Sequence, residues 1–353
     1  MYYNPKYLKR TKIVATLGPS TDSKETLRIM MDRGVDVFRI NFSHANHEDV
    51  KEKIKIIHSL NEEYGYNTAI LADLQGPKLR IGVVKEGVEL EAGDVLTFTN
   101  EEIIGNKERV YMNYKQFPND VKVGENILVD DGKIVLKVLK TNNKDEVQAE
   151  VVQGGPLFSK KGVNLPNTKI SQPALTEKDI RDARFAIKHH VDWVALSFVR
   201  TAQDVMDLKE IIDENAEYKV PIIAKIEKPE ALENIDEIIK VVDGLMVARG
   251  DLGVEMPIEE VPEHQKSLIG KAKLARIPVI VATQMMESMM TSLTPSRAEV
   301  NDVANAVYDG ADAVMLSGET SVGDYPVEVI ETMTKILQRV EDSPTIKVPT
   351  LKP

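Results

Sequence analysis

The sequence contains no cysteine among its 353 residues. Disulfide bonds, thiolate metal ligands and a cysteine nucleophile are therefore excluded, and the composition suits a reducing compartment. No uncharged apolar run approaches the roughly 18 residues of a membrane span, and the N-terminus lacks the apolar stretch of a signal peptide. We expect a soluble, cytoplasmic protein with no membrane partner.

Basic residues are also in the minority, 45 against 56 acidic ones, which leaves a net charge of −11. A nucleic-acid-binding protein concentrates basic residues on one face, and no long block of Lys or Arg occurs here. No GxxxxGK[ST] loop is present, and no GxGxxG motif opens a helix. These absences argue against a nucleic-acid partner, a P-loop enzyme and a dinucleotide-binding fold.

Apolar runs of strand length, by contrast, recur along the chain, and each is followed by a segment of helical period. Their starts lie 23 to 35 residues apart, except for one gap of 125, and the shorter spacing fits a strand, a helix and two loops. The runs are apolar at consecutive positions, which is typical of parallel strands covered on both faces. An α/β fold with a (β/α)8 TIM barrel is therefore predicted, although periodicity alone leaves an open doubly wound sheet as an alternative. The runs are residues 12–18, 35–44, 68–76, 193–199, 221–227, 244–253, 278–283 and 313–319.

The long gap holds a different pattern, because apolar and polar residues alternate there. Asp131-Gly132 stands between two such alternating segments, which is a strong hairpin signal. We predict a small all-β domain inserted after strand 3, with the barrel formed by residues 1–77 and 171–353 and the insertion by residues 78–170. A domain attached at the carboxyl end of a barrel strand is placed to act as a lid.

Charged side chains stand where the predicted strands end, which is where barrel enzymes place their chemistry. Glu227 and Asp251 end neighbouring runs and can share one hard divalent cation such as Mg²⁺. Lys225 faces the same side of its strand as Glu227, and a fixed cation beside a metal suits a transferring phosphoryl group or a developing enolate. Structural ion pairs are the alternative for each residue taken alone, including a simple salt bridge between Lys225 and Glu227.

Two further features are weaker signals. Gly250 and Gly253 allow backbone N–H groups to approach a small anion, or they form only a tight turn. Arg39 and Arg80 are candidates to bind a phosphate through two parallel hydrogen bonds from the guanidinium group, or they are solvated or structural charges.

Long blocks of the sequence resemble the pyruvate kinase family. They are TKIVATLGPS, FRINFSH, DLQGPK, SKKGVNLP, AKIE, VARGDLGVE, ATQMMESM, PSRAEVNDVANAV and MLSGETSVGDYP. They span residues 11 to about 340 in the family's order. The resemblance implies Mg²⁺-dependent phosphoryl transfer from phosphoenolpyruvate to ADP, which gives pyruvate and ATP in the last step of glycolysis; Mn²⁺ is an alternative ion.

The resemblance also implies a role for each matching residue. Lys225 stabilises the phosphoryl group in flight, Thr283 lies near the reacting carbon, and Ser317 belongs to the hydroxyl and water chain that protonates the enolate. Glu227 and Asp251 are the implied Mg²⁺ ligands. The implied substrate-binding set is Arg39 on the phosphate, Lys225, Ala248, Arg249 and Gly250 around the carboxylate, Asp251 and Thr283. The implied nucleotide-side set is Asn41, His44, Arg80 and Lys161.

The monovalent-cation position departs from the family pattern. Many relatives bind K⁺ near the residues that match Asn41, Ser43, Asp73 and Leu74. The family usually has Thr at position 74 and Glu at position 78, whereas this sequence has Leu74 and Lys78. Leu74 removes a hydroxyl ligand, and the Lys78 ammonium can supply the charge that K⁺ otherwise brings. We expect activity that is largely independent of K⁺.

Usual family members continue into a C-terminal α/β domain that binds phosphorylated effectors and forms one subunit interface. Residues 341–353 end this sequence without such a domain, as in a natural short form or a truncated one. We expect no effector regulation through that domain. A homodimer through the barrel, near residues 295–307, is expected, and a homotetramer is not.

Two other interpretations stay open from the sequence. One is a different Mg²⁺-dependent barrel acting on phosphoenolpyruvate or a 2-oxo acid, such as an aldolase or lyase, against which the inserted domain, Arg80 and Lys161 count. The other is a folded but inactive protein, against which the presence of every implied catalytic residue counts.

Overall fold

A computed structural model describes residues 9–43 and 45–343 and contains a closed barrel of parallel strands. The barrel strands are β1 (Lys12–Thr16), β2 (Val37–Asn41), β3 (Ala69–Asp73), β12 (Trp193–Leu196), β13 (Ile222–Ile226), β14 (Gly244–Ala248), β15 (Val279–Ala282) and β16 (Ala313–Leu316). Each predicted apolar run supplies one of these strands. The predicted (β/α)8 barrel is confirmed, and the pairing of β1 with β16 excludes an open sheet.

Both faces of the strands are buried, as their consecutive apolar residues require. Ile13 and Ala15 belong to the cluster between strands and helices, whereas Val14 belongs to a second cluster, with Leu71 and Met246, inside the barrel. Successive side chains of a strand point to opposite faces, so an uninterrupted apolar run fills both layers.

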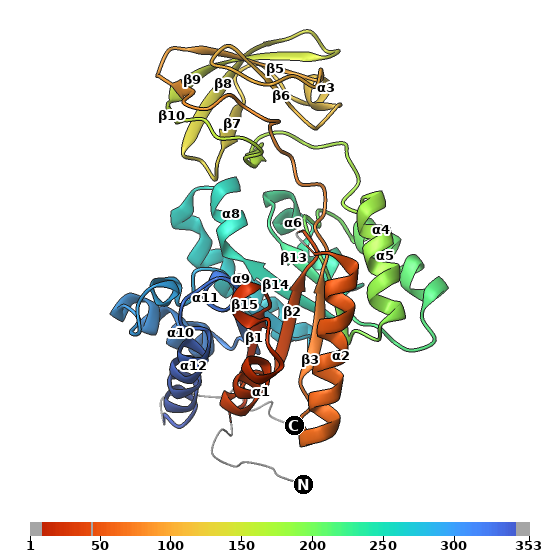
Figure 1. Cartoon of the computed structure of the whole chain (residues 1–353). Coiled ribbons are helices and arrows are strands. Elements are labelled where there is room, and N and C mark those ends of the chain that lie inside the picture. Colours follow the sequence, from red (N-terminus) through yellow and green to blue (C-terminus); the bar gives the residue numbers. More distant parts are fainter. Residues whose placement is uncertain (1–8, 44, 344–353) are drawn as a thin grey trace. The chain divides into compact units, whose positions relative to one another are not determined.

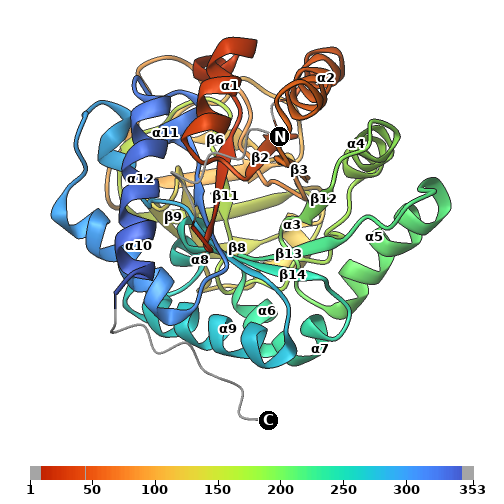
Figure 2. The same cartoon turned by 90° about the horizontal axis from the view of Figure 1, so that it is seen from below.

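Helices surround the strands in a ring, seen most clearly in the view from below for α1, α2, α4, α5, α7, α9, α10 and α12 (Figure 2). Several helices begin at a capping box, including α4 at Thr176 with Asp179 and α5 at Thr201 with Asp204. The helices are α1 (Lys24–Arg33), α2 (His47–Tyr64), α4 (Glu177–Lys188), α5 (Ala202–Asn215), α6 (Pro229–Glu233), α7 (Ile235–Ile239), α9 (Val261–Ala275), α10 (Arg297–Asp309), α11 (Gly318–Ser321) and α12 (Pro326–Glu341), with 3₁₀ turns η2 (Pro19–Thr21) and η4 (Glu287–Met290). None of the helices in residues 9–43 and 45–343 is both long enough and apolar enough to cross a membrane.

The segment between β3 and α4 forms mostly β structure (Figure 1). It has its own apolar core. Its larger sheet has the order β11-β7-β8-β9-β5-β6, and β4 pairs with β10. The predicted hairpin at Asp131-Gly132 joins β7 to β8. A short helix, α3 (Phe117–Asp120), was not predicted by the alternating pattern. The strands are β4 (Glu89–Leu90), β5 (Val95–Thr99), β6 (Arg109–Tyr111), β7 (Asn126–Val129), β8 (Ile134–Thr141), β9 (Glu146–Gln153), β10 (Gly155–Pro156) and β11 (Val163–Asn164).

The chain divides into two compact units. The barrel unit comprises Met1–Gly76, Leu175–Gly250 and Pro262–Pro353, and the inserted unit comprises Pro77–Ala174 with Asp251–Val261. The helix α8 (Arg249–Glu255) begins in the barrel unit and continues into the inserted unit, followed by the 3₁₀ turn η3 (Ile258–Glu260).

Candidate active site

A buried ammonium group lies at the carboxyl ends of the barrel strands. Lys225, near the end of β13, is 8% exposed. Its Nζ is 2.9 Å from Glu227 Oε1 and 3.2 Å from Asp73 Oδ1. It also donates a 2.7 Å hydrogen bond to Ser197 Oγ. Lys225 is therefore held from three directions, rather than by a salt bridge to Glu227 alone.

The second cation of the cluster is Arg39 in β2. The register places Asn41 opposite Asp73 and Arg39 opposite Leu71, two residues before the end of β3. Arg39 Nε lies 2.6 Å from Asp73 Oδ2, and Nη1 donates to Thr16 Oγ1 at 3.1 Å. Burial alone would raise the pKa of Asp73, but the charges of Lys225 and Arg39 outweigh it and hold this pKa below its usual value. Asp73 is therefore an anion shared by two cations.

Glu227 is held by a backbone group as well as by Lys225. The Phe198 N–H donates to Glu227 Oε2 at 2.7 Å. Phe198 has a φ of 55°, which is costly for a residue with a large side chain. Strain of this kind persists only where the surroundings fix the backbone, and here it aims an N–H group at the carboxylate.

The loops after β14 and β15 are bound together by Arg249. Its Nη2 donates to the Thr283 carbonyl at 2.7 Å, and Nη1 lies 2.7 Å from Asp302 in α10. The Gly250 N–H donates to Thr283 Oγ1 at 2.7 Å, and the same hydroxyl donates to the Ala282 carbonyl at 2.6 Å. Thr283 has a φ of 69°, again strained for a β-branched residue. The Arg249 guanidinium thus binds groups of the protein. The resemblance to a carboxylate-binding loop therefore concerns the backbone of Ala248, Arg249 and Gly250.

The end of β16 is organised by Glu319, which is buried. Its Oε2 accepts the Ser317 N–H at 2.7 Å, and its Oε1 accepts the Met286 N–H at 3.1 Å. This carboxylate connects the segment that carries Ser317 to the loop after Thr283.

The loop after β2 carries Asn41 and Ser43, whose N–H donates to Asn41 Oδ1 at 3.1 Å. Lys178 in α4 donates to the Phe42 carbonyl at 2.7 Å, which anchors this loop. Leu74 is buried next to Asp73 and offers no side-chain oxygen. His44, predicted as a nucleotide-side contact, lies outside the described residues.

The predicted residues of the inserted unit form a separate group. Lys161 lies 2.8 Å from Asp130 Oδ1, and its Nζ is 5.7 Å from the centre of the Phe158 ring. The hydrogen bond from Lys161, supported by one from Lys133, keeps the pKa of Asp130 below its usual value. Arg80 donates to the Lys160 carbonyl at 2.9 Å, and Lys78 lies two residues earlier in the chain.

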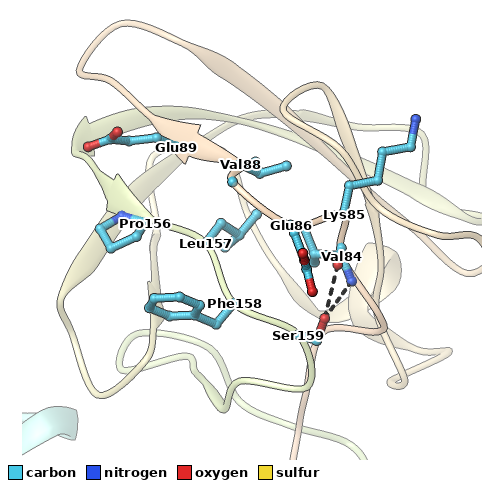
Figure 3. Close-up of a pocket in the computed structure, with 10 residues that line it drawn as sticks. Val84, Lys85, Glu86, Val88, Glu89, Pro156, Leu157, Phe158 and Ser159 are labelled. Carbon is cyan, nitrogen blue, oxygen red and sulfur yellow. Dashed lines mark hydrogen bonds between the residues drawn. The ribbon is translucent and has the colours of Figure 1, made fainter.

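A pocket of about 390 Å³ also lies in the inserted unit (Figure 3). It is lined by residues 84–89 and 156–159, which include none of the predicted site residues. The one hydroxyl in its wall, that of Ser159, is bonded to both the N–H and the carbonyl of Val84. The wall also includes the charged residues Lys85, Glu86 and Glu89.

The two predicted metal ligands are carboxylates, which suit a magnesium ion by their chemistry. Glu227 follows β13, and Asp251 lies in α8 directly after the neighbouring strand β14. Carboxylate oxygens are the protein ligands that Mg²⁺ prefers, and the ion completes its shell with water and substrate oxygens. In the part of the chain that the structure describes, no group of three or more His, Asp or Glu side chains is placed to hold a metal ion by itself.

Sequence reasoning missed Ser197. Its hydroxyl donates to the Leu74 carbonyl at 2.7 Å and accepts the hydrogen bond from Lys225. The strand-end rule could have found it, since Ser197 directly follows β12. The contribution of the Phe198 N–H had no such signal, because it depends on a backbone angle.

Comparisons with known proteins agree on one family. A family model described as pyruvate kinase, barrel domain, matches residues 8–330. A pyruvate kinase of Corynebacterium glutamicum is 49% identical over 334 residues, which are 94% of this chain and 70% of the relative. A pyruvate kinase of Thermotoga maritima is 48% identical over 335 residues, 95% of this chain and 72% of the relative. The crystal structure of a pyruvate kinase from Cryptosporidium parvum matches with a TM-score of 0.90 at 38% identity, covering 94% of this chain and 69% of that one.

Proposed function

The chain belongs to the pyruvate kinase family, and we propose that the cluster around Lys225 is its phosphoryl-transfer site. The protein is a phosphotransferase that moves the phosphoryl group of phosphoenolpyruvate to ADP, giving pyruvate and ATP.

The observation that carries the proposal is the buried Lys225 ammonium, fixed by Asp73, Glu227 and Ser197. A phosphoryl group in transfer spreads negative charge over its oxygens, so catalysis depends on cations that are already in place. Lys225 needs no reorganisation to meet that charge. Arg39, which stands on β2 and is held by Asp73, binds the phosphate of the substrate.

The remaining roles concern the organic part of the substrate. The backbone of Ala248, Arg249 and Gly250 binds its carboxylate, and Thr283 lies beside the carbon that is protonated. Ser317 belongs to the hydroxyl chain that delivers this proton. The bond from Gly250 to Thr283 supports this arrangement, because it ties the carboxylate loop to the proton-transfer side.

Glu227 and Asp251 are the residues that would hold the Mg²⁺ ion that the family generally requires, and Mn²⁺ suits the same oxygen donors. When bound, such an ion neutralises negative charge on the substrate oxygens. Lys225 and the Phe198 N–H orient the Glu227 carboxylate for this task.

We place the nucleotide beside Asn41, His44, Arg80 and Lys161. The assignment of Lys161 is supported by its position next to Arg80, since the Arg80 guanidinium donates a hydrogen bond to the Lys160 carbonyl.

We further propose a cytoplasmic location, which the absence of cysteine supports. We also propose a homodimer through the barrel near residues 295–307, which the exposed Val300 and Tyr308 of α10 support.

We also propose that activity is largely independent of K⁺, although the family usually requires this ion. Leu74 supplies no hydroxyl where a ligand is usual, and Lys78 brings a positive charge. Turnover is measured with K⁺ and then with a large inert monovalent cation at constant ionic strength. Equal rates support the proposal, and a many-fold loss without K⁺ refutes it.

The test of the site is a coupled pyruvate-formation assay with phosphoenolpyruvate, ADP and Mg²⁺. Lys225→Met is expected to lower kcat by about 10²–10³-fold, since a buried charge aimed at the reacting group is removed. Lys219→Met is the control, because Lys219 precedes the same strand and forms an exposed pair with Asp243. Equal rates for wild type and Lys225→Met would remove the proposed role, and pyruvate release without ADP would point to a lyase instead.

A further inference from the structure

One buried carboxylate binds both ends of the long inserted segment between β3 and α4, which we call the two crossings; the chain also passes between the units at residues 250–251 and 261–262. The chain leaves the barrel unit after Gly76 and returns at Leu175. Asp179 Oδ1 accepts the Gly76 N–H at 3.0 Å, and Oδ2 accepts the Thr176 N–H at 2.9 Å as well as the Thr176 hydroxyl. Asp179 is fully buried, and all these groups belong to the barrel unit.

A capping box alone does not require this arrangement. In the next β/α unit, Asp204 has the same position in α5 and accepts the Thr201 N–H at 2.9 Å through Oδ2. Asp204 also binds the Arg200 N–H, which is local to its own loop. The bond from Asp179 to Gly76 instead joins residues that are 103 positions apart. Asp179 therefore performs the capping role and a second, long-range one.

Gly76 in turn packs against the residues that hold the catalytic cluster. It has a φ of +68°, and a Cβ at this position would lie 2.8 Å from Phe198 Cδ2 and 3.1 Å from Ser197 Cβ. Ser197 binds Lys225, and the Phe198 N–H binds Glu227. A shift of Gly76 therefore acts directly on the segment that orients both charged groups.

We propose that Asp179 is a positioning residue that fixes both crossing points and, through Gly76, sets Ser197 and Phe198 for catalysis. The inference rests on the proposed function for the role of Lys225 and Glu227. The physical reason is that backbone errors of about 1 Å at a reacting centre reduce rates steeply. The connection to the inserted unit is thus coupled to the phosphoryl-transfer site within the barrel itself.

The first test measures amide hydrogen exchange in the full chain, which does not depend on turnover. In Asp179→Asn the amide nitrogen cannot accept a hydrogen bond, so one crossing loses its partner. We expect exchange around residues 74–78 or 174–178 to be about tenfold faster than in wild type. Asp204→Asn is the matched control and is expected to change exchange only around residues 200–204. Unchanged exchange at both crossings in Asp179→Asn would overturn the proposal.

The second test separates positioning from a general loss of stability. We expect Asp179→Asn to lower kcat about tenfold while the KM for ADP stays within about twofold, and Asp204→Asn to leave both unchanged. Gly76→Ala provides a second route to the same effect, because its Cβ displaces Ser197 and Phe198 directly. Equal kinetic losses in Asp179→Asn and Asp204→Asn, or a fully active Gly76→Ala, would contradict the proposal. If wild type itself formed no pyruvate from phosphoenolpyruvate and ADP, the proposed function would fail, and the exchange experiment would still decide the role of Asp179.

Discussion

At the scale of single residues, Asp73 shows how two buried cations are kept close together. Arg39 and Lys225 would repel each other if no anion lay between them, and each would be costly to bury alone. Asp73 contacts Arg39 through Oδ2 and Lys225 through Oδ1, so each oxygen serves one cation. The carboxylate therefore makes a doubly positive site possible in the barrel interior.

Replacing Asp73 with Asn is expected to lower the free energy of unfolding by about 3 kcal/mol, because a buried ion cluster loses its shared anion. Urea unfolding measures this difference. Since the native pKa of Asp73 is depressed, its stabilising contribution is complete above the ordinary pKa of about 3.9 and is lost as the pH falls from there through the native pKa. The gap between the two proteins should therefore be constant from about pH 5 to 8 and shrink only in more acidic solution. Asp213→Asn, which removes an exposed pair with Lys209, serves as the control and should unfold like wild type.

Lys161 and Lys133 offer a matched comparison, because both contact the Asp130 carboxylate. Lys161→Met is expected to raise the KM for ADP about tenfold with little change in kcat, since a phosphate contact made throughout the reaction contributes to binding alone. Lys133→Met, which removes an exposed side chain, should leave the KM unchanged. Initial rates at varied ADP measure both. A rise of the same size in both variants would mean that only the charge of the inserted unit matters.

The strand-end rule found most of the cluster from the sequence, because polar residues after an apolar run are conspicuous. Lys225 and Glu227 were expected on one side of their strand, and their 2.9 Å contact agrees with this. The rule did not indicate that Arg39 and Lys225 would share Asp73, since that depends on the register of β2, β3, β12 and β13. Nor does the sequence contain the positive φ of Phe198 or Thr283, which results from packing around the backbone.

At the scale of elements, the connections between strand ends are as important as the strands. Arg249 contacts the carbonyls of Ala282 and Thr283 after β15 and the carboxylate of Asp302 in α10. A planar guanidinium can satisfy these acceptors together, and an ammonium group cannot. The strained backbone at Thr283 therefore depends on the hydrogen bonds that the Arg249 guanidinium donates.

Arg249→Lys is accordingly expected to lower kcat about tenfold and the free energy of unfolding by about 2 kcal/mol. Asp302→Asn keeps the two carbonyl contacts and is expected to give a smaller loss of kcat. Steady-state kinetics and thermal unfolding measure the two effects. A fully active Arg249→Lys would show that Thr283 keeps its conformation without the guanidinium group.

Element boundaries were predictable only in part. The run at residues 244–253 was predicted as one segment, yet β14 ends at Ala248 and α8 begins at Arg249, the first charged residue of the run. Arg249 marks the end of the apolar stretch, but a charged residue does not by itself indicate that a helix begins there. The helix α3 was missed because it is only four residues long and too short to show a period.

At the scale of the whole molecule, barrel closure lies beyond local periodicity. It depends on the pairing of Lys12 with Ala313 and of the residues that follow them. The eight strand-helix units favoured a closed barrel, but their periodicity alone also fits an open sheet, so this contact needed the structure. The insertion, in contrast, was visible as a change from consecutive to alternating apolar residues, and it has an apolar cluster distinct from those of the barrel.

Separate cores predict separate responses to core mutations. The chain has one tryptophan, Trp193, at the start of β12, where it pairs with Leu71 inside the barrel unit. Its fluorescence therefore reports barrel unfolding. Phe98 is fully buried in the inserted unit and packs edge-on against Phe117 at 5.6 Å between ring centres.

Phe98→Ala is expected to destabilise the inserted unit by about 3–5 kcal/mol and to leave the Trp193 transition in urea at its wild-type midpoint. Amide exchange of β5, β8 and β9 should accelerate in the same variant, since these strands surround the lost side chain. Leu71→Ala is the matched change in the barrel, and it should move the Trp193 transition to lower urea while β5, β8 and β9 keep their protection under native conditions. If Phe98→Ala moved the Trp193 midpoint as far as Leu71→Ala does, the two units would unfold as one cooperative body, and the boundaries at residues 77 and 174 would carry no energetic meaning.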